Sequence, residues 1–411
     1  MHKVQLLAPA RNLENLKIAI AYGADAVYIG GEAFGIIGST KDYTKEEMIE
    51  GIKFAHDRDK KVYVTVNVLP HNDDFIQLEK YLLGLEKIGV DALIIADPGV
   101  LDIVKKVVPN MELHLGSQAN TTNYVSANFW YEQGIKRVVA TRELSCEEIA
   151  QIRANTPLDL DIEAFVHGEI CISYSGRCLI SSYIRGNSKE VSLEELRNRE
   201  YSLMEEKRPG EYYPVYEDER GTFLFNSKDL CMIGNISDLI KSGVTSLKIE
   251  ARMKDSYYIA AVVRAYRMAI DAFYKDPTKW KLEHVWLEEL KKGSYRDFTT
   301  GFYLSENSED AIIEEVDTVS KPYECIGIVV DVDQNNQVAL IKTKGNINVL
   351  EKIEVIAPYT DTIVATIEEL YDEDENSMES ISDLNRLVKV KLSTKVDKDY
   401  MLRREIKNDK N

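Results

Sequence analysis

One short stretch of the sequence, residues 163–182, combines an acid, a histidine and two cysteines. Glu163 and His167 come first, and Cys171 and Cys178 follow on either side of a glycine-containing turn. Carboxylates and imidazoles transfer protons, while thiolates act as nucleophiles or as ligands of metals and clusters. We therefore predict that the catalytic residues of this chain are Glu163, His167, Cys171 and Cys178.

The cysteines of this stretch allow three kinds of chemistry. A later segment carries a further cysteine, Cys231, back towards this stretch. Together with Cys171 and Cys178 it makes three thiols. They include no Cys-x-x-Cys pair, which weakens the reading as a zinc site. His167 and Cys171 could form a nucleophile pair, and an iron–sulfur cluster would need a fourth thiolate. The residues alone leave these alternatives open.

The composition is that of an ordinary globular protein. Hydrophobic residues make up 44% of the 411 positions and charged residues 29%. No apolar run approaches the roughly 20 residues of a membrane helix. The apolar segment at the start of the sequence is too short for a signal peptide. We expect a cytoplasmic protein without a membrane partner. The net charge of -18 argues against non-specific binding to nucleic acid, but it leaves room for a local basic patch.

The first 275 residues repeat one unit, a short apolar strand followed by an amphipathic helix. Eight strands are expected, at residues 4–9, 26–30, 62–68, 92–96, 112–117, 137–141, 161–166 and 246–249. Alternation of this kind requires a parallel sheet, and eight repeats close a (β/α)8 barrel. An open doubly wound sheet is the alternative, but no Gly-x-Gly-x-x-Gly follows the first strand. We therefore predict an α/β fold with a (β/α)8 TIM-like barrel over 1–275, interrupted by a long insertion at 171–229.

Such a barrel carries its active site where the carboxyl ends of its strands meet. The positions that follow the expected strands, together with the cysteine stretch, provide a polar ring. We predict substrate-binding roles for its members Asn67, Asp97, Gln118, Arg142, Tyr174, Arg177, Glu250 and Arg252. The guanidinium groups suit a dicarboxylate, because they pair with carboxylates through two hydrogen bonds. Tyr174 could stack on a nucleobase.

The chain changes character after the barrel. Residues 276–321 read as a polar connecting segment with a short helix of its own. Residues 322–411 contain β-branched runs separated by turns, which predict a small antiparallel β-barrel domain.

Several motifs resemble those of one known family, the collagenase-like peptidases of peptidase family U32. The stretch that carries Glu163, His167, Gly168, Cys171 and Cys178 resembles its signature. Further similar motifs lie at residues 7–10, 206–212, 217–221, 226–231 and 246–250. The resemblance covers nearly the whole chain and is strongest to the larger branch, the tRNA uridine hydroxylation proteins.

This resemblance implies a barrel with an appended β domain. It also implies a part in the 5-hydroxylation of the tRNA wobble uridine, with prephenate as a required metabolite and tRNA as a partner. The alternatives are a collagenase-like peptidase and a non-catalytic subunit that works with a paralogue.

The resemblance further implies a 4Fe-4S cluster on four cysteines. Cys171, Cys178 and Cys231 match three of these metal ligands, whereas residues 189–199, where the family has the fourth, contain no cysteine. The chain also departs from the family pattern after Gly168, where Glu169 replaces a small residue.

Overall fold

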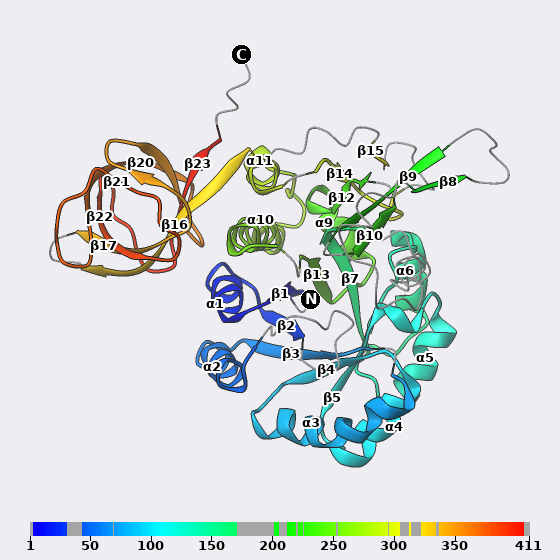
Figure 1. The fold of residues 1–411 in the computed structure, drawn as a ribbon. Coiled ribbons are helices and arrows are strands. Elements are labelled where there is room, and N and C mark those ends of the chain that lie inside the picture. The colour runs from blue at the N-terminus through cyan, green and yellow to red at the C-terminus, as the bar shows by residue number, and fades with distance from the viewer. Residues whose placement is uncertain are drawn as a thin grey trace.

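The computed structural model describes residues 3–30, 43–68, 70–170, 201–204, 212–218, 221–224, 226–251, 254–294, 296–304, 312–313, 322–333 and 337–406. Its larger part is a closed barrel of eight parallel strands surrounded by helices (Figure 1). The strands are β1 (Gln5–Pro9), β2 (Ala26–Gly30), β3 (Lys61–Val66), β4 (Ala92–Ile95), β5 (Glu112–Leu115), β6 (Arg137–Val139), β7 (Asp161–Gly168) and β13 (Ser246–Glu250). Because β13 pairs with both β1 and β7, the ring is closed, and the predicted barrel is confirmed.

The helices cover the outside of the barrel, so the strands are apolar on the face that they turn towards the helices. They are α1 (Leu13–Ala21), α2 (Lys45–His56), α3 (Phe75–Lys87), α4 (Pro98–Val107), α5 (Tyr124–Glu132), α6 (Cys146–Ala154), α9 (Ile236–Lys241) and α10 (Ser256–Lys275). Asn12 and Thr44 cap α1 and α2 by accepting hydrogen bonds from backbone N–H groups of the first turn. None of the helices in the described ranges has the length and apolar character needed to cross a bilayer.

The insertion between β7 and β13 extends the barrel wall. Strands β8 (Tyr201–Met204), β9 (Tyr212–Asp218) and β10 (Gly221–Leu224) form a small antiparallel sheet. β11 (Asn226–Ser227) pairs with β15 (Ile312–Ile313). β12 (Asp229–Cys231) lies antiparallel to the end of β7 and parallel to β14 (Phe298–Thr299), which places Cys231 beside the candidate site.

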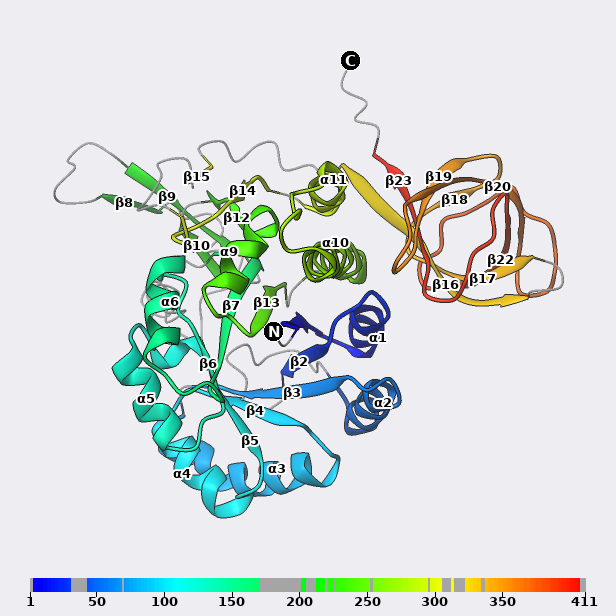
Figure 2. The same ribbon diagram turned by 180° about the vertical axis from the view of Figure 1, so that it is seen from behind.

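The C-terminal part is a closed antiparallel barrel of six strands, as predicted. In spatial order these are β16 (Tyr323–Asp333), β17 (Val338–Thr343), β22 (Leu387–Leu392), β20 (Ile363–Tyr371), β19 (Lys352–Ile356) and β23 (Met401–Glu405), with β18 (Ile347–Asn348) and β21 (Ser380–Ile381) as a separate pair. Figure 2 shows this domain beside α1, α10 and α11 (His284–Gly293), the short helix expected in the connecting segment.

A buried ionic contact joins the two barrels. The guanidinium of Arg403 on β23 is fully buried and lies 2.7 Å from carboxylate oxygens of both Glu289 on α11 and Glu354 on β19. It also donates a hydrogen bond of 3.2 Å to the hydroxyl of Tyr257 on α10. At the far end of α1, the Tyr22 hydroxyl donates to the Ile356 carbonyl at 3.0 Å. The domains therefore share an interior rather than a loose hinge.

Candidate functional site at the barrel mouth

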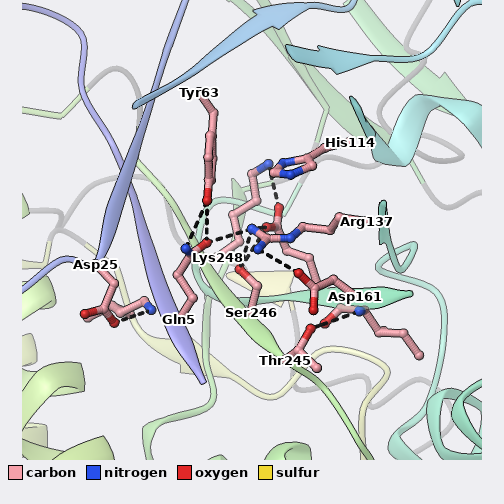
Figure 3. Close-up of polar contacts among 12 residues, drawn as sticks. Gln5, Asp25, Tyr63, His114, Arg137, Asp161, Thr245, Ser246 and Lys248 are labelled. Carbon is pink, nitrogen blue, oxygen red and sulfur yellow. Dashed lines mark hydrogen bonds and ion pairs between the residues drawn. The ribbon is translucent and has the colours of Figure 1, made fainter. Parts of the chain in front are cut away.

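The interior of the large barrel holds a network of charged side chains below the mouth (Figure 3). Glu163 on β7, whose side chain is 1% exposed, lies at its centre. Its carboxylate accepts hydrogen bonds from Lys248 Nζ at 3.0 Å, Ser246 Oγ at 2.9 Å and Arg137 Nη1 at 3.2 Å. Burial by itself would raise the pKa of Glu163, but Lys248 and Arg137 lower it to about 2. The carboxylate is therefore ionised at neutral pH and is a weak proton acceptor.

Further polar side chains extend this network across the barrel. Arg137 also donates to Gln5 at 2.7 Å and to Asp161 at 3.0 Å. On β5, His114 Nε2 lies 2.8 Å from Glu112 Oε1, and its ring stands edge-on to Tyr63 at 4.7 Å. Burial lowers the pKa of His114, so this imidazole stays neutral. The network fixes the lower half of the barrel and supports the mouth above it.

Arg142 lies at the mouth, three residues beyond the end of β6. Its guanidinium stacks on the ring of Phe165, with its central carbon 4.2 Å from the ring centroid. Nη1 donates to the Glu169 carbonyl at 2.9 Å, and Nη2 lies 3.4 Å from Glu250 Oε2. Two predicted substrate-binding residues, Arg142 and Glu250, are thus brought together. Lys248 Nζ approaches the same Phe165 ring at 5.6 Å.

Three other predicted ring residues lie on the same rim. Asn67 Nδ2 donates to Gln118 Oε1 at 3.4 Å, which links the ends of β3 and β5. Asp97 caps α4, because its Oδ1 accepts from Gly99 N at 2.7 Å and from Val100 N at 3.1 Å. Capping α4 is a local structural role that explains an aspartate at position 97. Asn67 and Gln118 instead present amide groups to the mouth.

Sequence reasoning missed two cations of the rim, Lys254 and Arg296. Lys254 Nζ lies 2.7 Å from Glu169 Oε1, and Arg296 Nη1 lies 3.5 Å from Asp229 Oδ1 and 4.0 Å from the same Glu169 oxygen. Both come from irregular segments, so no periodicity marks them. Only the pairing of β12 with β14 and the start of α10 place them beside β7.

His167 leaves the barrel interior because of an irregularity in β7. Phe165 pairs with Lys248 but His167 pairs with Ile249, so Val166 is an extra residue and the alternation of faces is reset. His167 lies fully buried against Tyr266 and Tyr258 of α10 and Phe298 of β14.

The hydrogen bonds around Tyr266 assign the imidazole tautomer. The Tyr266 hydroxyl donates to the Val166 carbonyl at 2.6 Å and accepts from Met232 N at 3.1 Å. Its 3.4 Å contact with His167 Nδ1 therefore has the imidazole as the donor. Nε2 of His167 is then a buried acceptor that finds no partner among the described residues. Burial, with a contribution from Lys254, lowers the pKa of His167 to about 3, so the ring is neutral.

Cys231 lies directly across the strand pair from His167. Its thiol is 3.9 Å from the Tyr266 hydroxyl, and burial raises the pKa of Cys231 to about 11. In the part of the chain that the structure describes, no three His, Cys, Asp or Glu side chains are placed to hold a metal ion. The predicted residues Cys171, Tyr174, Arg177, Cys178 and Arg252 lie outside the described residues. Of the three cysteines that the resemblance assigns to a cluster, only Cys231 therefore lies within the described residues.

Comparison with known proteins places this geometry in a family. The family described as "Peptidase family U32" matches this chain over residues 11–313. The family described as "Peptidase family U32 C-terminal domain" matches residues 321–403. The chain is 36% identical over 404 residues to tRNA hydroxylation protein P1 of Bacillus subtilis, covering 98% of this chain and 95% of that protein. It is 35% identical over 400 residues to tRNA hydroxylation protein P of Escherichia coli, covering 87% of each chain.

A protein of Helicobacter pylori with the same name, tRNA hydroxylation protein P, is 40% identical over 309 residues, covering 74% of this chain and 72% of that protein. The similarity to the Bacillus subtilis protein extends through both barrels, including the strands that carry Glu163 and Arg403. The chain belongs to peptidase family U32.

Proposed function

We propose that this chain takes part in the hydroxylation of tRNA. The observation that carries the proposal is the near full-length similarity to tRNA hydroxylation protein P1, which spans both domains. We propose further that the modified nucleoside is the wobble uridine, hydroxylated at carbon 5, and that prephenate is a required metabolite. A tRNA substrate places the chain in the cytoplasm.

The barrel mouth supports this proposal through its chemistry. Arg142 presents a guanidinium plane that is already stacked on Phe165, and such a plane pairs with carboxylates and phosphates. Prephenate carries two carboxylates, and RNA carries one phosphate per nucleotide. Asn67 and Gln118, which follow β3 and β5, provide amide groups that can hydrogen-bond the edge of a base.

A second candidate function is a non-catalytic subunit that works with a paralogue. Hydroxylation inserts an oxygen atom and requires an oxidant and a carrier of electrons. Cys171, Cys178 and Cys231 are three of the four cysteines that a 4Fe-4S cluster of this family would use, and the fourth is absent from the sequence. In this version, a partner with a complete set of cysteines supplies the redox group, and the chain contributes to tRNA binding.

Among the described residues, the pair of His167 and Cys231 does not support a cysteine peptidase, whereas the predicted partner Cys171 lies outside them. A cysteine peptidase needs an accessible thiolate that a histidine activates. His167 is fully buried, and burial raises the pKa of its neighbour Cys231 to about 11. This pair therefore offers no nucleophile at neutral pH.

Deletion of the gene tests the proposal. Mass spectrometry of nucleosides from total tRNA should show a loss of 5-hydroxyuridine and its derivatives, and a plasmid copy should restore them. If restoration requires a paralogue that carries the missing cysteine, the chain is the partner subunit. The proposal is overturned if deletion leaves these nucleosides at their natural level and a plasmid copy adds none in a strain that lacks every paralogue.

A further inference from the structure

Three cationic side chains converge on one residue at the rim of the mouth. Glu169 directly follows β7, and its carboxylate lies 2.7 Å from Lys254 Nζ and 4.0 Å from Arg296 Nη1. Its carbonyl oxygen accepts a hydrogen bond of 2.9 Å from Arg142 Nη1. These cations come from three separate segments, after β6, before α10 and before β14. The three cations lie close together at the rim, each beside a carboxylate of Glu169, Glu250 or Asp229.

The arginines of this group are not saturated by their acidic neighbours. Arg142 Nη2 and Glu250 Oε2 are 3.4 Å apart, and Arg296 Nη1 and Asp229 Oδ1 are 3.5 Å apart. Both distances exceed the 2.7–2.9 Å of a good charge-assisted hydrogen bond. Neither guanidinium forms a two-bond pair with a carboxylate among the described residues. Within the described part of the chain, both therefore keep N–H donors that an anionic ligand could use.

We propose that Arg142, Lys254 and Arg296 form an oxyanion-binding site at the rim of the mouth, and that the Glu169 carboxylate is its built-in competitor. The Glu169 side chain is 40% exposed, so it can turn into solvent when a ligand arrives. Lys254 and Arg296 are only 13% and 19% exposed and stay in place. A carboxylate or phosphate oxygen then replaces the Glu169 carboxylate oxygen on Lys254 and Arg296, while Arg142 keeps its hydrogen bond to the Glu169 carbonyl.

This arrangement makes ligand binding weaker than the three cations alone would give. The ligand must displace an ion pair that already exists, and this pair is partly exposed, so its contribution is modest. The inference deepens the proposed function because it assigns the anion-binding part of the same mouth. It is tested by binding alone, without turnover, so its failure is distinguishable from failure of the tRNA hydroxylation proposal.

The experiment compares Glu169→Gln with Glu50→Gln in the full-length protein. Glu50 forms an exposed ion pair with Lys17 on the outside of the barrel, so its variant makes the same change in net charge away from the mouth. Affinities for malonate, inorganic phosphate and an unmodified tRNA transcript are measured by calorimetry and fluorescence anisotropy at fixed salt.

Glu169→Gln should bind an oxyanion about fivefold more tightly than the natural protein, whereas Glu50→Gln should not. A gain for malonate and phosphate assigns the site to small acids, and a gain for tRNA alone assigns it to the RNA backbone. Adding Arg296→Met to Glu169→Gln should remove the gain. Equal affinities of Glu169→Gln and Glu50→Gln for all three probes would overturn the inference.

Discussion

At the scale of single residues, the barrel interior depends on Glu163. Its carboxylate compensates the buried cations of Lys248 and Arg137, and breaking a buried pair of this kind costs about 3 to 5 kcal/mol. We therefore expect Glu163→Gln to lower the free energy of unfolding by this amount at pH 7. Glu50→Gln, which breaks only an exposed pair, should change it by less than about 1 kcal/mol.

The same residue gives the protein a defined acid sensitivity. The pKa of Glu163 is about 2 in the folded state against 4.5 for an ordinary glutamate, so its ionisation stabilises the fold above pH 4.5. This stabilisation, about 3 kcal/mol, should disappear as the pH falls from 4.5 to 2. Urea unfolding at several pH values should show that the free energy of unfolding falls less over this range for Glu163→Gln than for the natural protein. Equal pH profiles for the two proteins would contradict the assignment.

Residue types and strand ends were enough to predict part of the site. Arg142 and Glu250 were expected at the mouth because each follows a strand, and they meet there. Glu163 was expected to be catalytic, and the structure places its side chain in the ionic network below the mouth. Predicting that requires the register that brings Lys248 and Arg137 to the same layer, and a single sequence does not contain this information.

At the scale of elements, the irregular end of β7 separates His167 from the mouth. The strand was expected over 161–166 and was correctly placed, yet the extra residue Val166 reverses the face on which His167 lies. A bulge of this kind depends on pairing with β12 and β13 and leaves no signal in local composition. The other strands of the large barrel and the helices α1 to α6 follow from periodicity and caps, which act within a few residues.

Gly168 should be indispensable at this position. It has φ of +112°, and a Cβ placed on it would lie 1.6 Å from the carbonyl oxygen of Glu250 on β13. The backbones of Gly168 and Glu250 belong to two paired strands, so neither can move aside. We expect Gly168→Ala to destabilise the protein by more than about 3 kcal/mol.

The matched control is Gly84→Ala in the interior of α3. A Cβ at Gly84 would meet nothing within 4 Å, and alanine is the better helix former, so this change should stabilise by roughly 0.5–1 kcal/mol. Thermal unfolding of both variants gives the comparison. Similar melting temperatures for the two variants would show that the close approach at Gly168 is not a real constraint.

At the scale of the whole molecule, Arg403 couples the β domain to the barrel. Replacing it with methionine leaves the buried Glu289 and the half-buried Glu354 with less compensation, so we expect a loss of about 3 to 5 kcal/mol in the free energy of unfolding. Calorimetry should resolve two unfolding transitions where the natural protein shows one. Arg404→Met is the control, because Arg404 pairs with Glu324 and Glu351 within the β domain. A single, unshifted transition for Arg403→Met would refute the coupling.

The two-barrel architecture could be predicted from repeats and β-branched runs, but the joint between the barrels could not. Most of its strands were expected, whereas β23 was not, because Met401, Arg403 and Arg404 do not form a β-branched run. Yet β23 closes the small barrel and carries the arginine of the interface. Its strand character comes from pairing with β16 and β19 rather than from local propensity.

The central claim is that the barrel mouth serves tRNA hydroxylation. The most direct measurement compares Arg142→Met with Arg58→Met in restoring 5-hydroxyuridine derivatives to the tRNA of a strain that lacks the gene. Arg58 also stacks on an aromatic ring, that of Phe54 at 3.7 Å, but on the outside of the barrel. With equal protein levels, Arg58→Met should restore the nucleosides and Arg142→Met should restore less than about a tenth. Full restoration by Arg142→Met would contradict the account.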